Sequence, residues 1–152
     1  MNADIALESF RALLRRNEFP RLDAQIKLRA EGKQYTVSYA IEAGFDEEWD
    51  TTNDLTLFDD ELLKSALAID LFCPVRDNHR RGWKTWLFAN RPQLVHEVYL
   101  TIARSELSRN LQYVEGLQVL LTDAALSPFL GITTVQLLTE FPNAAMPSLI
   151  RL

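Results

Sequence analysis

Residues 90–126, NRPQLVHEVYLTIARSELSRNLQYVEGLQVLLTDAAL, carry the clearest structural pattern in the chain. Apolar side chains recur there every three or four residues in two series, which is the spacing of one face of an α-helix. The first series is Leu94, Val95, Val98, Tyr99, Ile102, Ala103 and Leu107, and the second is Leu111, Val114, Leu117, Leu121 and Ala124. Because only the short break Ser108–Asn110 separates them, the two helices must run antiparallel and bury these faces against each other.

Prolines are predicted to mark helix starts, because Pro fixes φ and lacks only an N–H that has no partner in the first turn. The pattern Pro-x-Leu occurs at Pro20, Pro92, Pro128 and Pro147. Pro92 and Pro128 are 36 residues apart, Pro128 and Pro147 are 19 apart, and the break at Asn110 halves the longer interval. A two-helix unit of about 37 residues is typical of helical-hairpin repeats. We therefore predict an all-α fold of stacked antiparallel helical hairpins, solenoid-like, with a closed helical bundle as the alternative.

Five more helices are predicted from apolar spacing and from signals at their ends. Asp59 or Asp60 is expected to cap the helix that runs to Pro74, because an Asp side chain there accepts a first-turn N–H. The other four are expected over 4–17, 20–32, 83–89 and 129–141.

Residues 34–43 allow two interpretations. Large side chains alternate with small ones as in a strand, at Tyr35, Val37, Tyr39 and Ile41. No second strand is evident to pair with this one, and a lone strand leaves its backbone groups unpaired. We therefore favour a helix that ends at Gly44.

The acidic stretch 46–58 is predicted to be a solvated loop that also holds Trp49. It would either join N-terminal helices in 1–45 to a helical-repeat part in 59–152, or lie within a single helical domain 1–152. Its spacing does not match a calcium loop, because Thr51 replaces the glycine of the sharp turn and Leu57 replaces the bidentate glutamate.

Composition narrows the choice of compartment and partner. The 152 residues carry a net charge of −5, which argues against nucleic acid and anionic membranes, because such binding depends on neutralising phosphates. Cys73 is the single cysteine, so it is expected to be a small buried hydrophobe in a reducing compartment. No apolar run approaches the roughly 18 residues of a membrane span, and the N-terminus lacks a signal-peptide pattern. We therefore expect the protein in the cytoplasm.

No motif in the sequence predicts catalysis, a cofactor or a metal site. His96–Glu97 lies on the central helix, but Leu100 stands where a zinc protease has its second histidine. The phosphate-binding motif Gly-x-x-x-x-Gly-Lys-Ser/Thr and the nucleophile motif Gly-x-Ser-x-Gly are both missing. We expect no enzyme; a pocket lined by His96, Glu97 and Tyr99 would change that expectation.

Two groups of residues are candidates for partner binding. One combines cations with indoles: Arg76, Arg80, Arg81, Trp83, Lys84 and Trp86. Trp and Arg dominate protein-binding hot spots, the same residue types bind single-stranded nucleic acid, and a solvated turn above core tryptophans is a third interpretation. The other group is the apolar last turn, Met146, Leu149, Ile150 and Leu152. A helix that short is unstable alone, so this end is expected to be covered by a partner or by a continuing chain.

The sequence from about Trp83 onward resembles the helical-repeat regions of large bacterial proteins. The residues behind the resemblance are Trp86, 91–98 (RPQLVHEV), 103–107 (ARSEL), Gly116–Leu117 and 137–142 (LLTEFP). Such regions include the HEAT-like arrays carried by NACHT-type NTPases of bacterial defence. The resemblance covers under half of the chain, transfers no catalytic residue, and implies a scaffold or sensor role.

These observations favour a non-enzymatic protein–protein interaction or scaffold module, whose partner is another protein or a second copy. The alternative is a nucleic-acid-binding module that uses the basic and aromatic residues of 76–84.

Overall fold

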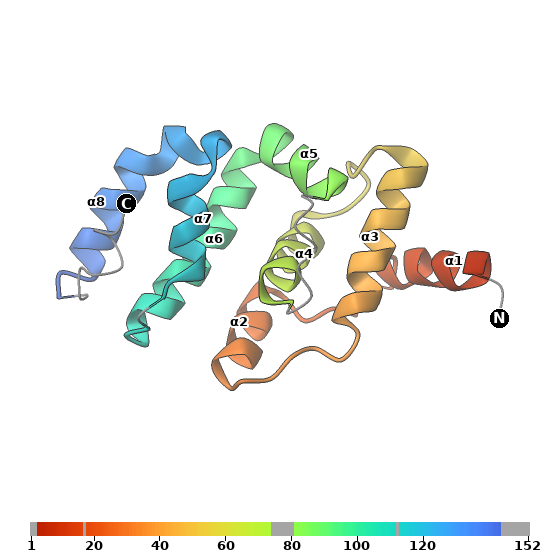
Figure 1. Ribbon diagram of the computed structural model, residues 1–152, viewed down its shortest axis with the longest axis horizontal. Coiled ribbons are helices and arrows are strands. Elements are labelled where there is room, and N and C mark those ends of the chain that lie inside the picture. The colour runs from red at the N-terminus through yellow and green to blue at the C-terminus, as the bar shows by residue number, and fades with distance from the viewer. Residues whose placement is uncertain (1–2, 17, 74–80, 112, 144–152) are drawn as a thin grey trace. The chain divides into compact units, whose positions relative to one another are not determined.

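The computed structural model describes residues 3–16, 18–73, 81–111 and 113–143, and it is helical throughout (Figure 1). Eight α-helices and one 3-10 helix follow one another, and the described residues contain no strand. The predicted all-α class is therefore confirmed. The chain forms two compact units: residues up to Asn90 (unit 1) and residues from Arg91 (unit 2).

Unit 1 contains five helices. They are α1 (Ala3–Leu14), α2 (Leu22–Ala30), α3 (Ser38–Thr52), α4 (Asp60–Phe72) and α5 (Gly82–Asn90). The predicted cap of α4 is confirmed, because the Asp59 carboxylate accepts the Leu62 N–H at 2.8 Å. Phe45 and Trp83 are fully buried in the core, with ring centroids 5.3 Å apart. Cys73 is buried, as expected.

Helix α3 shows where two sequence predictions are wrong. The helix favoured for 34–43 exists from Ser38, but it continues through Gly44 and ends only at Asn53, whose φ of 51° is left-handed. Residues 46–52, predicted to be a loop, are the second half of this helix. Gly44 does not end the helix because it is a crossing point: a Cβ there would lie 2.7 Å from the Phe10 carbonyl oxygen of α1.

Three of the five acidic side chains of α3, those of Glu42, Asp46 and Glu48, pair with cations. Glu48 is 2% exposed and accepts hydrogen bonds from Arg11 Nε at 2.9 Å and from Arg15 Nη2 at 3.0 Å, both on the α1 side. Burial alone would raise the pKa of Glu48, but the hydrogen bonds and charges of the two arginines lower it. An acidic run of this kind resembles a loop in sequence because its cationic partners lie 33 to 37 residues away.

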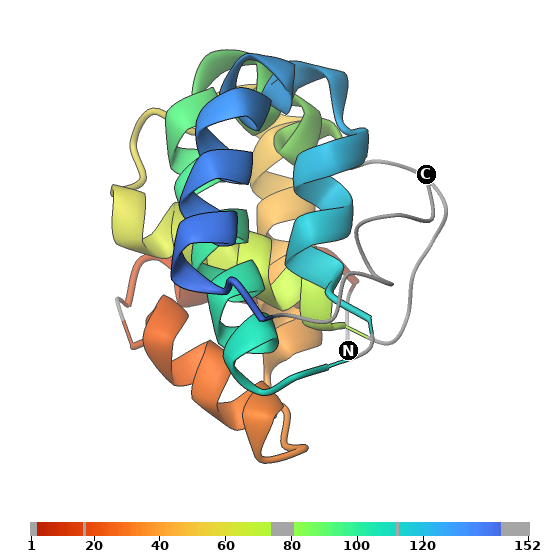
Figure 2. The same ribbon diagram turned by 90° about the vertical axis from the view of Figure 1, so that its left-hand side faces the viewer.

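Unit 2 contains α6 (Pro92–Ser108), α7 (Glu115–Thr122), the 3-10 helix η1 (Ala124–Phe129) and α8 (Leu130–Glu140). Helices α6, α7 and α8 lie side by side and alternate in direction (Figures 1 and 2). The predicted antiparallel hairpin of α6 and α7 is confirmed. All seven apolar residues of the first series are buried, including Tyr99, which is 0% exposed.

The second helix of that hairpin begins four residues later than the first residue of its predicted series. Leu111 is exposed and Ala124 belongs to η1, so neither is part of α7. The reason is local: Asn110 adopts a left-handed φ of 53° after α6. The buried Glu106 carboxylate then accepts the Gly116 N–H at 2.9 Å, which stabilises the first turn of α7.

The proline prediction is confirmed at one position and wrong at two. Pro92 occupies the first turn of α6, as predicted. Pro20 precedes Arg21, the N-cap of α2, and Pro128 lies inside η1, two residues before α8. The φ that proline imposes also suits a 3-10 turn and an extended approach to a helix. Pro147 lies outside the described residues.

None of the described helices is alone long and apolar enough to cross a bilayer. The pair Glu115–Thr122 and Ala124–Glu140 meets the length and composition criteria together, but it is bent by 95° at its break.

The crossing of α6 and α7 depends on Gly116. A Cβ at this position would lie 2.6 Å from the Tyr99 carbonyl oxygen and 2.7 Å from the Ala103 nitrogen. Both neighbours are backbone and cannot rotate away. We expect Gly116→Ala to lower the free energy of unfolding by about 1–3 kcal/mol, measured by urea denaturation.

Gly131→Ala is the matched control, because Gly131 also lies in the first turn of a unit 2 helix. Nothing lies within 4 Å of its Cβ position, so Ala should leave stability unchanged or raise it by up to about 1 kcal/mol. Equal losses in both variants would contradict the packing account.

Candidate interaction surface

Helix α8 is apolar on both of its sides. Its inner side is buried at Thr133 (2% exposed) and Leu137 (4%). Its outer side exposes Ile132 (58%), Val135 (66%) and Leu138 (41%). These three residues are three positions apart, so they share one side of the helix with Gly131 and Thr139. We call Gly131, Ile132, Val135, Leu138 and Thr139 the outer face of α8.

Side-chain contacts with α6 fix the orientation of this helix. His96 Nε2 and Thr133 Oγ1 are hydrogen-bonded at 2.7 Å, and the His96 ring stacks on Phe129 with centroids 4.5 Å apart. Near the other end of α8, Arg104 donates to the Glu140 carboxylate at 2.7 and 2.5 Å. Burial and the nearby Arg104 charge lower the pKa of His96, which favours the neutral form of its imidazole.

The outer face is uncharged. Residues 124–139 contain no Asp, Glu, Lys, Arg or His, in a chain whose net charge is −5. Asp123 and Glu140 flank this stretch: the Asp123 carboxylate accepts the Ala125 N–H, and Glu140 is paired with Arg104. The face therefore combines exposed apolar area with the absence of charge, which is the composition of the core of a protein–protein interface.

Other exposed apolar side chains in the described part of the chain are dispersed. They are Ile5 in α1, Tyr39 in α3, Leu57 before α4, and Leu111 and Tyr113 between α6 and α7. Among the described helices, α8 is the one that exposes more than one large hydrophobic residue. Single exposed hydrophobic residues are common on protein surfaces, whereas a helix that is apolar on two sides normally has neighbours on both.

The predicted basic patch is largely part of the internal structure of unit 1. Arg81 joins two helices: its Nη2 lies 3.1 Å from Glu42 and its Nη1 contacts Asp46, both on α3, while its Nε lies 3.4 Å from Asp70 on α4. Lys84 pairs with Asp70 as well. Arg76 and Arg80 lie outside the described residues.

The two tryptophans of the predicted patch differ in exposure. Trp83 is 0% exposed, and its indole N–H donates to Asp46 at 3.0 Å, so it cannot belong to a surface patch. Trp86 is half-buried, with its ring centroid 6.4 Å from that of Trp49. Of the three interpretations, the one with a tryptophan packed in the core therefore fits Trp83 best. Arg81 and Lys84 form ion pairs within unit 1.

The apolar last turn predicted as a contact site, at Met146, Leu149, Ile150 and Leu152, lies outside the described residues. The sequence does not single out the outer face of α8 as a site, because apolar spacing over 129–141 predicts a helix without distinguishing a core face from an exposed one. The sequence carries one signal of it: residues 129–139 contain no charged side chain, whereas a helix that covers a core normally carries charges on its other side.

The residues considered for an enzyme pocket are not brought together. His96 contacts α8, Glu97 is exposed, and Tyr99 is buried on the side of α6 that faces α7. No three His, Cys, Asp or Glu side chains in the described part of the chain are arranged to hold a metal ion.

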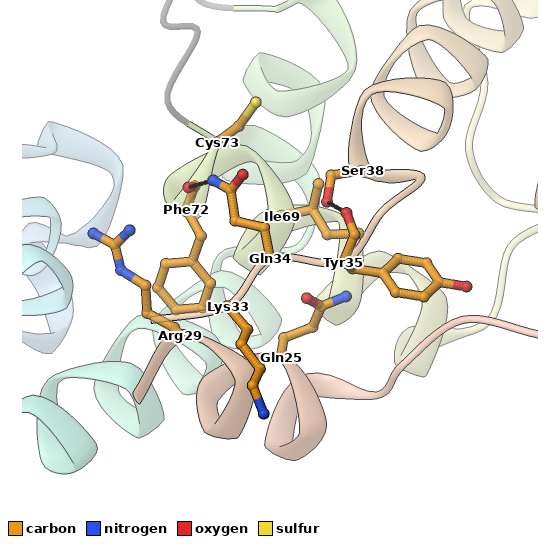
Figure 3. Close-up of a pocket in the computed structure, with 9 residues that line it drawn as sticks. All are labelled: Gln25, Arg29, Lys33, Gln34, Tyr35, Ser38, Ile69, Phe72 and Cys73. Carbon is orange, nitrogen blue, oxygen red and sulfur yellow. Dashed lines mark hydrogen bonds between the residues drawn. The ribbon is translucent and has the colours of Figure 1, made fainter. Parts of the chain in front are cut away.

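A shallow hollow in unit 1 lies between α2, the start of α3 and the end of α4 (Figure 3). The Arg29 guanidinium lies 5.4 Å from the centroid of the Phe72 ring, and the Gln34 amide donates to the Phe72 carbonyl oxygen at 3.2 Å. Lys33 pairs with Glu31 at 2.7 Å. The hollow has room for about one water molecule, so it is not a substrate pocket.

Comparison with known proteins gave no match with a family model, a curated protein or a solved structure.

The ion pairs of Arg81 with Glu42, Asp46 and Asp70 predict that the stability of unit 1 depends on pH. Burial raises the pKa of Glu42, and Arg81 only partly opposes this. A carboxyl whose pKa is higher in the folded state binds more protons when folded, so its contribution to stability is lost as pH rises from the unfolded pKa, about 4.3, through the folded one. We expect the free energy of unfolding of the Glu42→Gln variant to fall less between about pH 4 and pH 8 than that of the unsubstituted chain.

Glu18→Gln is the control for Glu42→Gln, because Glu18 is exposed. Its pH profile should follow that of the unsubstituted chain. If the Glu42→Gln profile also follows that of the unsubstituted chain, burial of Glu42 does not govern its ionisation.

Proposed function

We propose that this chain is a non-enzymatic protein–protein interaction or scaffold module that docks a partner on the outer face of α8. The observation that carries the proposal is the exposure of Ile132, Val135 and Leu138 on one uncharged side of a helix whose other side is buried. Full burial of one such side chain contributes about 1.5–3 kcal/mol. Since these three are already partly covered, a partner would gain on the order of 1 kcal/mol from each.

As part of this proposal, we infer that antiparallel hairpins stack as in a solenoid. Such stacking would explain why α8 has apolar residues on two sides. In a stack each helix pair has neighbours before and after it, so its helices are apolar on both sides. A closed bundle needs only one apolar side per helix. The alternating directions of α6, α7 and α8 and the resemblance to HEAT-like arrays agree with stacking, and the same resemblance supports placement in a larger bacterial assembly.

Binding of nucleic acid is not supported by the described residues of the basic patch. Arg81 and Lys84 already pair with three carboxylates, so phosphates would have to displace ion pairs within unit 1.

Val135→Glu tests the proposed docking face. A charge at this 66% exposed position leaves the core of unit 2 untouched, but it would have to be desolvated in an interface. We expect the variant to melt like the unsubstituted chain and to lose at least about tenfold in the amount of protein partner that co-purifies from the native cell, since one buried unpaired charge costs more than 1.4 kcal/mol.

Leu57→Glu is the matched control, because Leu57 is 83% exposed, in unit 1, and equally apolar. It should retain co-purifying protein at the level of the unsubstituted chain. Equal recovery with all three proteins would remove the outer face of α8 from the proposal.

A further inference from the structure

His96 connects α6 to the buried side of α8. Its Nε2 is hydrogen-bonded to Thr133 Oγ1 at 2.7 Å, and Thr133 is 2% exposed. The imidazole also stacks on Phe129, the last residue of η1, with ring centroids 4.5 Å apart and 16° between the ring planes. We call this hydrogen bond and this stacking the His96 contact. One titratable ring therefore touches both segments that follow α7.

The surroundings of His96 do not provide a counter-charge for a protonated imidazole. Residues 124–139 contain no acidic side chain, so neither η1 nor α8 offers a carboxylate before Glu140. Glu140 lies about 10 Å along the helix from Thr133, and it is paired with Arg104. Burial, and after it the positive charge of Arg104 on α6, lower the pKa of His96.

The remaining charged side chains of the neighbouring elements have other positions or roles. On α6, Arg91 is the N-cap residue and Glu97 is exposed. On the α7 side, Glu115 begins the helix, and the carboxylate of Asp123 caps η1. None of these four side chains contributes to the shift in the pKa of His96. A charge on the imidazole would therefore be desolvated without compensation.

We infer that the His96 contact is a pH-sensitive switch: the neutral imidazole holds α8 against α6, and protonation loosens that attachment. Histidine suits this role because its charge changes within the physiological range of pH. The inference goes beyond the proposed function, because it concerns the buried side of α8 and holds whether or not a partner binds the outer face.

The direction of the pH dependence follows from the lower pKa in the folded state. A closed α8 binds fewer protons at His96 than an opened one. The contribution of His96 to the attachment is therefore complete above the pKa of a solvated imidazole, about 6.5, and is lost as pH falls through that value to the folded pKa. Within this window the ratio of opened to closed α8 rises by up to about tenfold per pH unit, because opening takes up one proton.

Amide hydrogen exchange of the full chain between about pH 5 and pH 7.5 tests the switch. After correction for the intrinsic exchange rate, the protection of the α8 amides should fall as pH falls. The protection of the buried middle of α6, around Val98 and Ile102, should change less. Equal losses in α6 and α8 would indicate opening of unit 2 as a whole and would overturn the inference, as would α8 protection that stays constant or rises on acidification.

His96→Gln separates His96 from the other titratable groups. The glutamine amide can still hydrogen-bond to Thr133, but it binds no proton, so the protection of α8 should no longer depend on pH. His79→Gln is the matched control, because the chain has two histidines, and it should keep the pH dependence of the unsubstituted chain. A decline that persists in His96→Gln would assign the effect to another group and overturn the inference.

A direct titration of the imidazole uses the unsubstituted chain and so does not depend on the folding of any variant. Observed by NMR, the ring of His96 should titrate below about pH 6.5, and a midpoint at or above that value would overturn the inference. The proposed function is tested separately, because Val135→Glu is compared with the unsubstituted chain at neutral pH, where the His96 contact is closed in both. Failure of either proposal therefore leaves the other standing.

Discussion

Two side-chain contacts from α6, His96 with Thr133 and Arg104 with Glu140, decide which side of α8 is exposed. Hydrophobic burial alone discriminates poorly between the two sides, because both are rich in aliphatic residues. A rotated helix would leave Thr133 and the His96 ring without each other, and an unsatisfied buried polar group costs about 1–3 kcal/mol. These polar contacts therefore fix the rotation of α8 about its own axis, which apolar packing alone would not determine. As a result, one apolar face of the helix stays exposed.

Charge is distributed differently in the two units. In unit 1 the guanidinium of Arg81 contacts three carboxylates from α3 and α4, and Arg11 and Arg15 contact the buried Glu48. These cations hold helices together and are not available as a positive surface. In unit 2 the exposed face of α8 contains no charged group. The outer face of α8 therefore offers apolar contact rather than electrostatic attraction.

Sequence periodicity predicted the parts of the fold that depend on local spacing. It predicted the α6–α7 hairpin, the buried face of α6, the Asp59 cap and the start of α6 at Pro92. It failed where contacts between distant residues decide. The acidic run in α3 is helical because arginines from α1 and Arg81 neutralise it, and the predicted patch residue Trp83 is buried because Asp46 accepts its N–H. The outer face of α8 has the same apolar spacing as a core face, so spacing alone cannot distinguish an interface from a core.

Three of the four glycines in the described helices, Gly44, Gly116 and Gly131, give a last physical argument about that face. Glycine costs a helix interior up to about 1 kcal/mol relative to alanine, so its presence needs a compensating contact. Gly44 and Gly116 have one, because each admits the backbone of a neighbouring helix where a Cβ would collide. Gly131 lies on the outer face and meets nothing within the chain. A partner helix that docked on the proposed face would give Gly131 the same structural reason that the other two already have.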